Sequence, residues 1–228
     1  MQSRWYRFLM PFSRLITAAT HALPATGNCR SVAERCLVKL LQPARSIMAP
    51  EHAFVVTGAA SGIGHATAVR LIERGHRVLS LDVKKPTAQV AEHTSCDLSD
   101  PASIDVALSR IAGPVSALLN IAGVPGTVGA EKTMRVNLLG LRHLTEGLWD
   151  RIADNGRIVN VASIAGNNWR KRRGALAELL ATSDFATGLA WWHAKGAGVG
   201  TDAYTFSKEA WYSTRCSLRA AGSPAAFA

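Results

Sequence analysis

Apolar positions between residues 53 and 163 recur with two periods, one typical of buried strands and the other of amphipathic helices. Short apolar runs predict strands at residues 53–57, 77–82, 93–97, 115–123 and 156–163, the fourth of which ends in a turn. Helical spacing predicts helices at residues 65–75, 100–111 and 131–152. Because strands and helices alternate, we predict an α/β fold with a doubly wound parallel sheet that is covered on both faces.

Residues 167–200 interrupt this alternation, and we interpret them as an insertion. They contain one predicted helix near residues 175–180 and an aromatic pair, Trp191 and Trp192. The pair could line a pocket, form a contact surface or pack within the fold. The sequence leaves these three alternatives open.

The first 47 residues differ in composition from the rest of the chain. They carry seven basic residues against one acid, Glu34, and so hold +6 of the formal charge of +10. Three interpretations stay open: an over-long reading frame, since Met48 stands just before the first strand; an organelle targeting segment, which acid-poor and arginine-rich sequences resemble; or a functional extension. We divide the chain into a basic leader at 1–47 and one domain at 48–228.

Composition favours a soluble globular protein of a reducing compartment. Hydrophobic residues make up 48% of the chain and charged residues 18%, and no apolar run approaches the roughly 18 residues of a membrane span. The four cysteines form no CxxC motif, so we expect neither disulfides nor a metal site. We therefore expect a cytoplasmic protein with no membrane partner.

The basic run RKRR at residues 170–173 raises the question of nucleic-acid binding. No recognised binding motif surrounds the run, and most of the basic character belongs to the leader. We interpret the run as a solvated loop and predict no nucleic-acid partner. A basic interaction module built from the leader and the run is a lesser alternative, and salt-sensitive binding would support it.

A glycine-rich turn, TGAASGIG, lies between the first predicted strand and the helix after it. Gly58 permits a tight turn, Gly62 lets the backbone come close to a pyrophosphate, and Gly64 allows close packing of helix on strand. A phosphate would then accept hydrogen bonds from free N–H groups at the helix N-terminus. With a strand before it and a helix after it, the turn predicts a dinucleotide site of the Rossmann type.

Asp82 ends the second predicted strand and bears on the choice of dinucleotide. A carboxylate at this position can accept hydrogen bonds from two ribose hydroxyls, and it repels a 2′-phosphate. We therefore predict NAD as the cofactor rather than NADP. Lys84 or Lys85, which follow closely, could soften that exclusion.

Tyr204 and Lys208 stand one helical turn apart, on one face of a helix. A free phenol, with a pKa of about 10, is a poor base at neutral pH. A nearby ammonium stabilises the phenolate and so favours proton transfer to and from an alcohol. Ser163 follows the last predicted strand, so its hydroxyl can lie at the carboxyl edge of the sheet, where ligands bind in such folds.

Five segments occur in the order typical of the short-chain dehydrogenase/reductase family: TGAASGIG, NIAG, VNLLG, IVNVASIAG and YTFSK. The chain resembles that family from about residue 53 to residue 209. Within the family, NIAGVPGT and the long insertion before the tyrosine are similar to the bacterial coniferyl-alcohol dehydrogenase and 3α-hydroxysteroid dehydrogenase type. The resemblance implies an NAD-dependent oxidoreductase that interconverts a secondary or aromatic alcohol and its carbonyl by hydride transfer.

The resemblance also implies roles for individual residues. Ser163 would hydrogen-bond the substrate oxygen, Tyr204 would be the acid/base, and Asn137 would hold a water in a proton relay. Lys208 would bind the nicotinamide ribose, and Asn120 would also steady the central sheet. With Asp97 and Leu98 beside the adenine, the cofactor-binding residues would be Gly58, Ser61, Gly62, Ile63, Gly64, Asp82, Asp97, Leu98, Asn120, Ala122, Gly123, Tyr204 and Lys208.

The resemblance stops after Glu209. A family member would continue an apolar helix and add further strands and a substrate-covering segment, whereas WYSTRCSLRAAGSPAAFA shows no convincing apolar stripe. We expect a divergent tail at 210–228, a fold that is incomplete at its C-terminus, and weak or absent turnover. The alternative function is a catalytically impaired nucleotide-binding remnant of the family. The expected partners are a small alcohol or ketone and, as an open alternative, a second copy in a family-like homo-oligomer.

Overall fold

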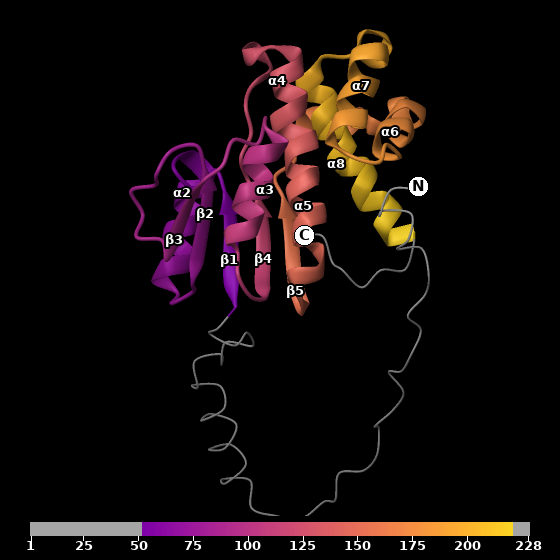
Figure 1. Cartoon of the computed structure of the whole chain (residues 1–228). Coiled ribbons are helices and arrows are strands. Elements are labelled where there is room, and N and C mark those ends of the chain that lie inside the picture. Colours follow the sequence, from indigo (N-terminus) through magenta and orange to yellow (C-terminus); the bar gives the residue numbers. More distant parts are fainter. Residues whose placement is uncertain (1–51, 221–228) are drawn as a thin grey trace, which may run out of the picture. The chain divides into compact units, whose positions relative to one another are not determined.

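The computed structural model describes residues 52–220, with side chains as far as Thr214 (Figure 1). These residues belong to one compact unit. The leader at 1–47 and the residues after 220 lie outside the described residues, so the expectations made for them stay predictions. Within the described range, no helix combines the length and the apolar character that a membrane crossing needs.

Five parallel strands form one sheet in the order β3, β2, β1, β4, β5 (Figure 1). Their bounds are β1 Ala53–Thr57, β2 Val78–Asp82, β3 Glu92–Ser95, β4 Val115–Asn120 and β5 Ile152–Asn160. Val55 at the centre of β1 pairs with Leu79 of β2 on one side and with Leu118 of β4 on the other. The strand order therefore reverses between β1 and β4.

The helices that flank the sheet begin and end close to their predicted positions. They are α2 Gly62–Glu73, α3 Pro101–Arg110, α4 Ala130–Met134 and α5 Leu141–Leu148. Asp100 caps α3 by accepting a hydrogen bond from Ala102 N at 3.0 Å. The helix predicted to reach Ile152 contains a π-helical segment, Arg135–Gly140, and it ends before Ile152 because that residue begins β5.

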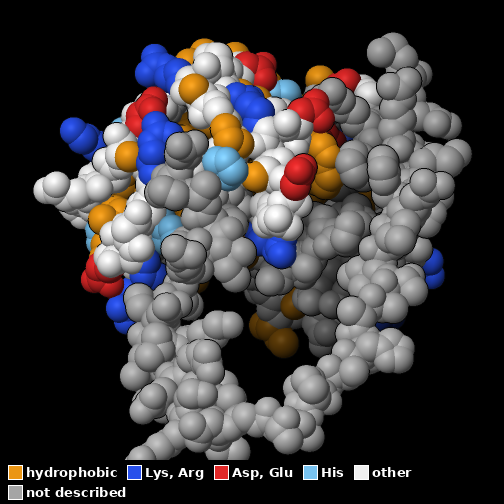
Figure 2. Space-filling model, turned by 90° about the horizontal axis from the view of Figure 1, so that it is seen from below, with side chains coloured by type: hydrophobic (Ala, Val, Ile, Leu, Met, Phe, Trp, Pro, Cys, Tyr) orange, Lys and Arg blue, Asp and Glu red, His pale blue; other side chains and the backbone are white. Residues whose placement is uncertain are grey.

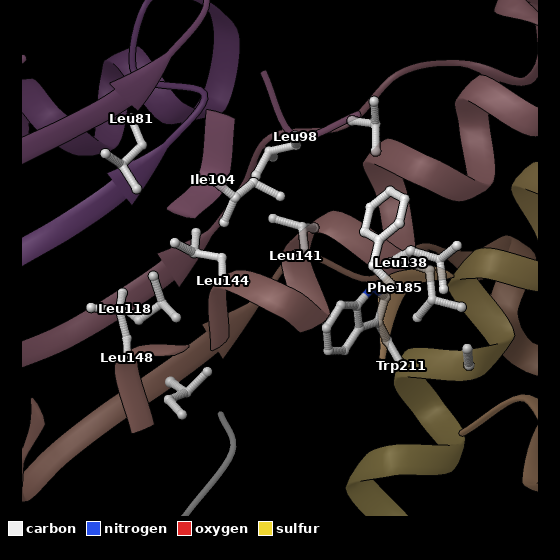
Figure 3. Packing of buried hydrophobic residues seen from close by; sticks show 14 of the residues in the cluster. Leu81, Leu98, Ile104, Leu118, Leu138, Leu141, Leu144, Leu148, Phe185 and Trp211 are labelled. Atoms are coloured by element: carbon white, nitrogen blue, oxygen red, sulfur yellow. The ribbon is translucent and has the colours of Figure 1, made fainter. Parts of the chain in front are cut away.

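Alternate residues of the central strands point into two hydrophobic cores, which is why these strands are apolar throughout. Val55 and Leu118 lie in the larger core with Ile104 of α3 and Leu144 of α5 (Figure 3). The residues next to them in sequence, Val56 and Leu119, lie in the smaller core with Ala68 of α2. Helices thus cover both faces of the sheet, and the predicted doubly wound, Rossmann-type fold is confirmed.

The insertion at 167–200 folds into helices that pack against α8, Ala203–Ala220 (Figure 1). The helix predicted near residues 175–180 is α6, Arg173–Leu180. A second helix, α7 Phe185–Lys195, was not predicted. Its start carries a capping box between Asp184 and Thr187, a signal that could have been recognised in the sequence.

Buried side chains attach the insertion to the rest of the domain. Arg142 of α5, with an exposed fraction of 3%, donates to the Thr182 carbonyl and, at 3.0 Å, to the Thr182 hydroxyl. Trp191 stacks on Phe206 of α8 with ring centroids 5.9 Å apart, and Trp192 is buried against the same ring. Of the alternatives left open for the tryptophan pair, packing within the fold is the one observed.

α8 continues well past Glu209, as far as Ala220, where the sequence showed no convincing apolar stripe. Ala210 and Trp211 nevertheless lie in the larger core, with exposed fractions of 0% and 6%. Figure 3 shows Trp211 among the other buried side chains. Polar Ser213 and Thr214 are buried as well and break the apolar pattern. The part of α8 whose side chains are described therefore has a buried face although its sequence shows no convincing apolar stripe, and the divergence of residues 210–228 stays a prediction.

We expect Trp211→Ala to lower the free energy of unfolding by about 3–5 kcal/mol, because it removes a buried ring and leaves a cavity. Trp211→Phe should cost about 1–3 kcal/mol, since it keeps a six-membered ring but loses the pyrrole part of the indole and the hydrogen bond from Trp211 Nε1 to the Asn137 carbonyl. Urea denaturation followed by circular dichroism measures both. Val106→Ala, at a 52% exposed position of α3, is the control, and a Trp211→Ala loss no larger than the control's would contradict this packing.

Candidate active site

The turn between β1 and α2 uses each of its three glycines differently. Gly58 has a φ of 74°, and a Cβ there would lie 2.9 Å from the Ala122 Cα. A Cβ at Gly64 would lie 2.0 Å from the Gly58 carbonyl oxygen, so α2 packs directly on the turn. Gly62 has a φ of 53° and open space where its Cβ would stand, which leaves its backbone accessible.

A cavity of about 420 Å³ lies at the carboxyl ends of the strands, at the point where their order reverses. The predicted cofactor residues that line it are Gly58, Ser61, Gly62, Ile63, Gly64, Asp82, Asp97, Leu98, Ala122 and Gly123. Lys132 and Val136 also line the cavity, and sequence reasoning missed them. Their four-residue spacing puts them on one helix face, which is the signal that could have found them.

Thr57 ties the carboxyl ends of β1 and β4 together beneath this cavity. Its hydroxyl accepts hydrogen bonds from Ile121 N at 2.9 Å and Ala122 N at 3.0 Å, and it donates to the Leu119 carbonyl at 3.3 Å. Thr57 is fully buried. The glycine-rich turn that starts at the next residue is therefore held against the loop that follows β4.

Two backbone N–H groups orient the carboxylate of Asp82. Oδ2 accepts from Ala60 N, in the glycine-rich turn, and Oδ1 accepts from Lys84 N, each at 2.9 Å. Lys84 contacts the carboxylate through its backbone, and neither Lys84 nor Lys85 lines the cavity. The Asp82 carboxylate thus faces the cavity. Neither Lys84 nor Lys85, which could have weakened its repulsion of a 2′-phosphate, has a side chain in the cavity wall.

Asp97 contributes a second carboxylate to the cavity wall. Its Oδ1 accepts hydrogen bonds from Ser99 N at 2.8 Å and from Ser99 Oγ at 2.7 Å. Partial burial acts to raise the pKa of Asp97, but the Ser99 hydrogen bonds and the charges of Lys132 and Arg135 hold that pKa below its usual value. The group is therefore an ionised acceptor at neutral pH.

Asn120 lies behind the cavity and not in its wall. It is 1% exposed, and the lining begins at the next residue, Ile121. Its amide nitrogen donates to Thr145 Oγ1 of α5 at 2.9 Å and to Asn160 Oδ1 of β5 at 2.8 Å. These contacts join β4 to β5 and α5 and keep the Asn120 side chain out of the first cavity, so the predicted contact of Asn120 with a cofactor stays a prediction.

A second cavity, of about 490 Å³, adjoins the first and is lined by Ser163, Tyr204 and Lys208. Ser163 follows β5, whereas Tyr204 lies in the first turn of α8. The insertion between them leaves the sheet and returns to the same cavity, so three of the four predicted catalytic residues come together. The lining residues common to both cavities are Ile63, Ile121, Gly123 and Val124.

Lys208 is almost fully buried, with an exposed fraction of 6%. Its Nζ donates to the Val161 carbonyl at 2.9 Å and lies 5.8 Å from the centroid of the Tyr204 ring. A Cβ added to Gly123 would lie 3.9 Å from the same Nζ. Burial lowers the pKa of Lys208 below its usual value. The amino group therefore stands beside both the phenol and the loop shared by the two cavities.

Asn137, the fourth predicted catalytic residue, lines neither of these cavities. Its side chain binds both backbone groups of Val124: Oδ1 accepts from Val124 N at 2.7 Å, and Nδ2 donates to Val124 O at 2.9 Å. Its own carbonyl, in the π-helical segment, accepts from Trp211 Nε1 at 2.9 Å. In this structure Asn137 fixes the loop between the two cavities, and its proton-relay role stays a prediction.

The sequence pattern of the short chain dehydrogenase family matches residues 52–175, more than half of the chain. The chain belongs to the short chain dehydrogenase family. Over 128 residues this short chain dehydrogenase is 42% identical to the coniferyl-alcohol dehydrogenase of Pseudomonas sp. (strain HR199 / DSM 7063), a match that covers 56% of the chain and 50% of that protein. The chain thus spans about half the length of the curated relative it matches.

Solved structures of other short chain dehydrogenases share the fold. The 3-alpha-hydroxysteroid dehydrogenase from Pseudomonas sp. B-0831, complexed with NADH, is 26% identical with a TM-score of 0.56, over 74% of this chain and 65% of that one. A short-chain dehydrogenase from Streptomyces avermitilis is 22% identical with a TM-score of 0.52, over 73% of this chain and 59% of that one. The second likeness concerns the fold alone.

Cys96 is a buried thiol in the wall of the first cavity of this short chain dehydrogenase. Burial, and then the charges of Asp97, Asp100 and Asp82, raise the pKa of Cys96 from 9.0 to about 11. Cys96 is therefore a protonated, unreactive thiol at neutral pH.

Within residues 52–220, no cluster of three or more His, Cys, Asp or Glu side chains is arranged to hold a metal ion.

We expect Cys96 to make stability fall as pH rises from about 9 to about 11. In that window the unfolded thiol loses its proton while the folded thiol keeps it, so the folded state binds more protons and rising pH favours unfolding. Urea denaturation at several pH values, with Cys96→Ala as the reference, measures this difference. If the two chains lose stability in parallel across the window, the raised pKa is wrong.

Proposed function

We propose that the chain is an NAD-dependent oxidoreductase that interconverts a secondary or aromatic alcohol and its carbonyl by hydride transfer. The observation that carries the proposal is the shared cavity of Ser163, Tyr204 and Lys208, which adjoins the cavity at the glycine-rich turn. An acid/base beside a dinucleotide site is what such a reaction needs, because the alcohol must lose a proton as well as a hydride.

The residues of the first cavity fit a nicotinamide dinucleotide. The open backbone at Gly62 offers N–H groups to a pyrophosphate, since nothing stands within 4 Å of the position of its missing Cβ. The oriented carboxylate of Asp82 suits two ribose hydroxyls and disfavours a 2′-phosphate, which supports NAD over NADP. The dinucleotide would supply the hydride acceptor, and the relative from Pseudomonas sp. B-0831 was solved with NADH.

The chain's own residues then divide the proton chemistry among them. Ser163 donates a hydrogen bond to the substrate oxygen, and Tyr204 accepts the proton of the alcohol. Lys208, fixed by the Val161 carbonyl, places a cation near the phenol and favours its ionised form. Asn137 keeps the loop at Val124 in register between the two cavities.

The residues that line the second cavity favour an apolar, ring-bearing alcohol, such as an aromatic alcohol or a sterol, as the substrate. Apart from the three catalytic candidates, they consist of small or apolar residues: Ile63, Ile121, Gly123, Val124, Pro125, Gly126, Val161 and Ala162. Ile164, next to Ser163 in the chain, is 85% exposed, and Ile63 is 64% exposed. Exposed apolar side chains near a cavity favour an apolar ligand over a polar one.

The face drawn in Figure 2 bears on the alternative of a nucleic-acid partner. Figure 2 shows Lys and Arg side chains dispersed among acidic ones on the coloured part of this face, with no continuous basic stripe there. Nucleic-acid binding relies on cations gathered on one face. The absence of a nucleic-acid partner, a homo-oligomer and a cytoplasmic location all stay predictions.

We expect Asp82→Ala to narrow the preference for NAD over NADP, because it removes the carboxylate that binds ribose hydroxyls and repels a 2′-phosphate. Asp82→Asn is the matched variant, since it keeps the shape and an acceptor but loses the charge. Quenching of protein fluorescence by NADH and NADPH gives both dissociation constants. Tighter binding of NADPH than of NADH by the unmutated chain would contradict the assignment of NAD.

The sequence predicts weak turnover for this chain, and we expect Tyr204→Phe to reduce that rate by a further factor of at least about 100, because it removes the acid/base and leaves the first cavity intact. Tyr212→Phe, on the same helix, is the control and should keep the unmutated rate. NADH formation with an aromatic alcohol, followed by absorbance, measures all three chains. Binding of NADH by the unmutated chain without turnover of any alcohol would favour the nucleotide-binding remnant instead.

A further inference from the structure

Arg172, at the end of the 3₁₀ segment Ile164–Arg172, contacts both α8 and the loop before it. Its Nε and Nη2 donate to the carbonyls of Val199 and Gly200, both at 2.9 Å. Its Nη1 donates to Glu209 Oε1 at 2.6 Å. One planar guanidinium thus binds the chain on both sides of the segment that holds the candidate catalytic residues of α8.

The buried carboxylate of Glu209 makes removal of the Arg172 guanidinium unfavourable for the stability of the fold. The side chain of Glu209 is 0% exposed, while that of Arg172 is 18% exposed. In the part of the chain that the structure describes, its other carboxylate oxygen has no hydrogen-bond partner. Burial raises the pKa of Glu209, and the charge of Arg172 opposes that rise. Loss of the guanidinium would leave a buried carboxylate uncompensated, so Arg172 is held in place.

Local geometry fixes the start of the same segment. Gly200 has a φ of 71°, which allows the sharp turn into α8. Asp202 Oδ1 accepts a hydrogen bond from Thr205 N at 3.0 Å, as a residue at a helix start does. Because Tyr204 lies between the two anchors of Arg172, a shift of either anchor would move its phenol relative to the sheet.

We propose that Arg172 is a positioning residue for Tyr204, acting through both ends of the segment 199–209. This inference rests on the proposed function, in which Tyr204 is the acid/base. Small errors in the placement of a catalytic group reduce the rate strongly, so an anchor on each side of the phenol has a direct chemical use.

The other cations of the RKRR run differ from Arg172. Arg170 lies over the ring of Trp169, with its Cζ 4.8 Å from the ring centroid. Lys171 and Arg173 are exposed. The interpretation of the run as a solvated loop therefore fails for Arg172, and Arg173 offers a matched control of the same residue type.

The test incorporates 3-fluorotyrosine into the full chain and follows Tyr204 by fluorine NMR during titration with NADH. Tyr204→Phe assigns its resonance among the three tyrosines. The variants are Arg172→Gln, Arg172→Lys and the double variant Arg172→Gln/Glu209→Gln, with Arg173→Gln as the control. Fluorescence quenching gives the NADH affinity of each chain, and urea denaturation gives its stability.

Arg172→Gln should still bind NADH, more weakly than the unmutated chain because Lys208 lies in the same segment, and even at saturating NADH it should lack the NADH-induced shift of the Tyr204 resonance. The double variant should regain stability, because it removes the unpaired buried charge of Glu209. It should not regain the Tyr204 shift, because the hydrogen bonds from Arg172 to the carbonyls of Val199 and Gly200 are still missing. Arg172→Lys should give an intermediate shift, since it keeps the charge without the planar fork. Arg173→Gln should behave like the unmutated chain.

A double variant that regains both stability and the Tyr204 shift would show that Arg172 only balances the charge of Glu209, and it would overturn the positioning role. An Arg172→Gln chain with the full Tyr204 shift would do the same. If NADH binds to the unmutated chain and its Tyr204 resonance stays unchanged, the proposed function itself is overturned, and the positioning role with it.

Discussion

Parallel pairing of β4 with β1, on the side of β1 opposite to β2, is the constraint on which the candidate active site depends. Because the chain leaves these neighbouring strands toward opposite faces of the sheet, their carboxyl ends cannot be covered by one connection and a crevice remains. The buried Thr57 hydroxyl, bonded to Ile121 N and Ala122 N, keeps the crevice at a fixed width. The glycine-rich turn and the Gly123 loop can then face each other across it.

The candidate active site depends secondly on the position of α8. Polar side chains of this helix, buried among apolar ones, form hydrogen bonds with distant parts of the chain. Lys208 donates to Val161, Trp211 donates to Asn137, and Glu209 accepts from Arg172. The partners lie in the loop after β5, in the π-helical segment and at the end of the 3₁₀ segment, and a buried polar group that loses its partner costs more than an exposed one. The three contacts together allow few orientations of the helix against the sheet.

The sequence predicted those parts of the site that depend on local patterns. Residues 53–57 form the predicted strand, and the glycine positions and Asp82 follow from their spacing along the chain. The sequence could not predict contacts between residues that are far apart along the chain. Nothing local distinguishes Arg172 from its basic neighbours, since a buried carboxylate 37 residues later selects it. Trp211 precedes a run rich in polar residues, and both its packing in the larger core and its bond to the Asn137 carbonyl involve segments that only the tertiary fold brings near.

The bond from the Trp211 indole to the Asn137 carbonyl bears on how chimeras of this chain should be built. The family pattern matches residues 52–175, and the resemblance read from the sequence stops after Glu209, which makes that residue an obvious junction for grafting the C-terminal segment of a relative. A junction there would discard the indole and strip the π-helical segment of a hydrogen-bond donor, two residues beyond the cut. A junction placed after Thr214 would instead keep the Trp211 indole in the same chain as the carbonyl that accepts its hydrogen bond.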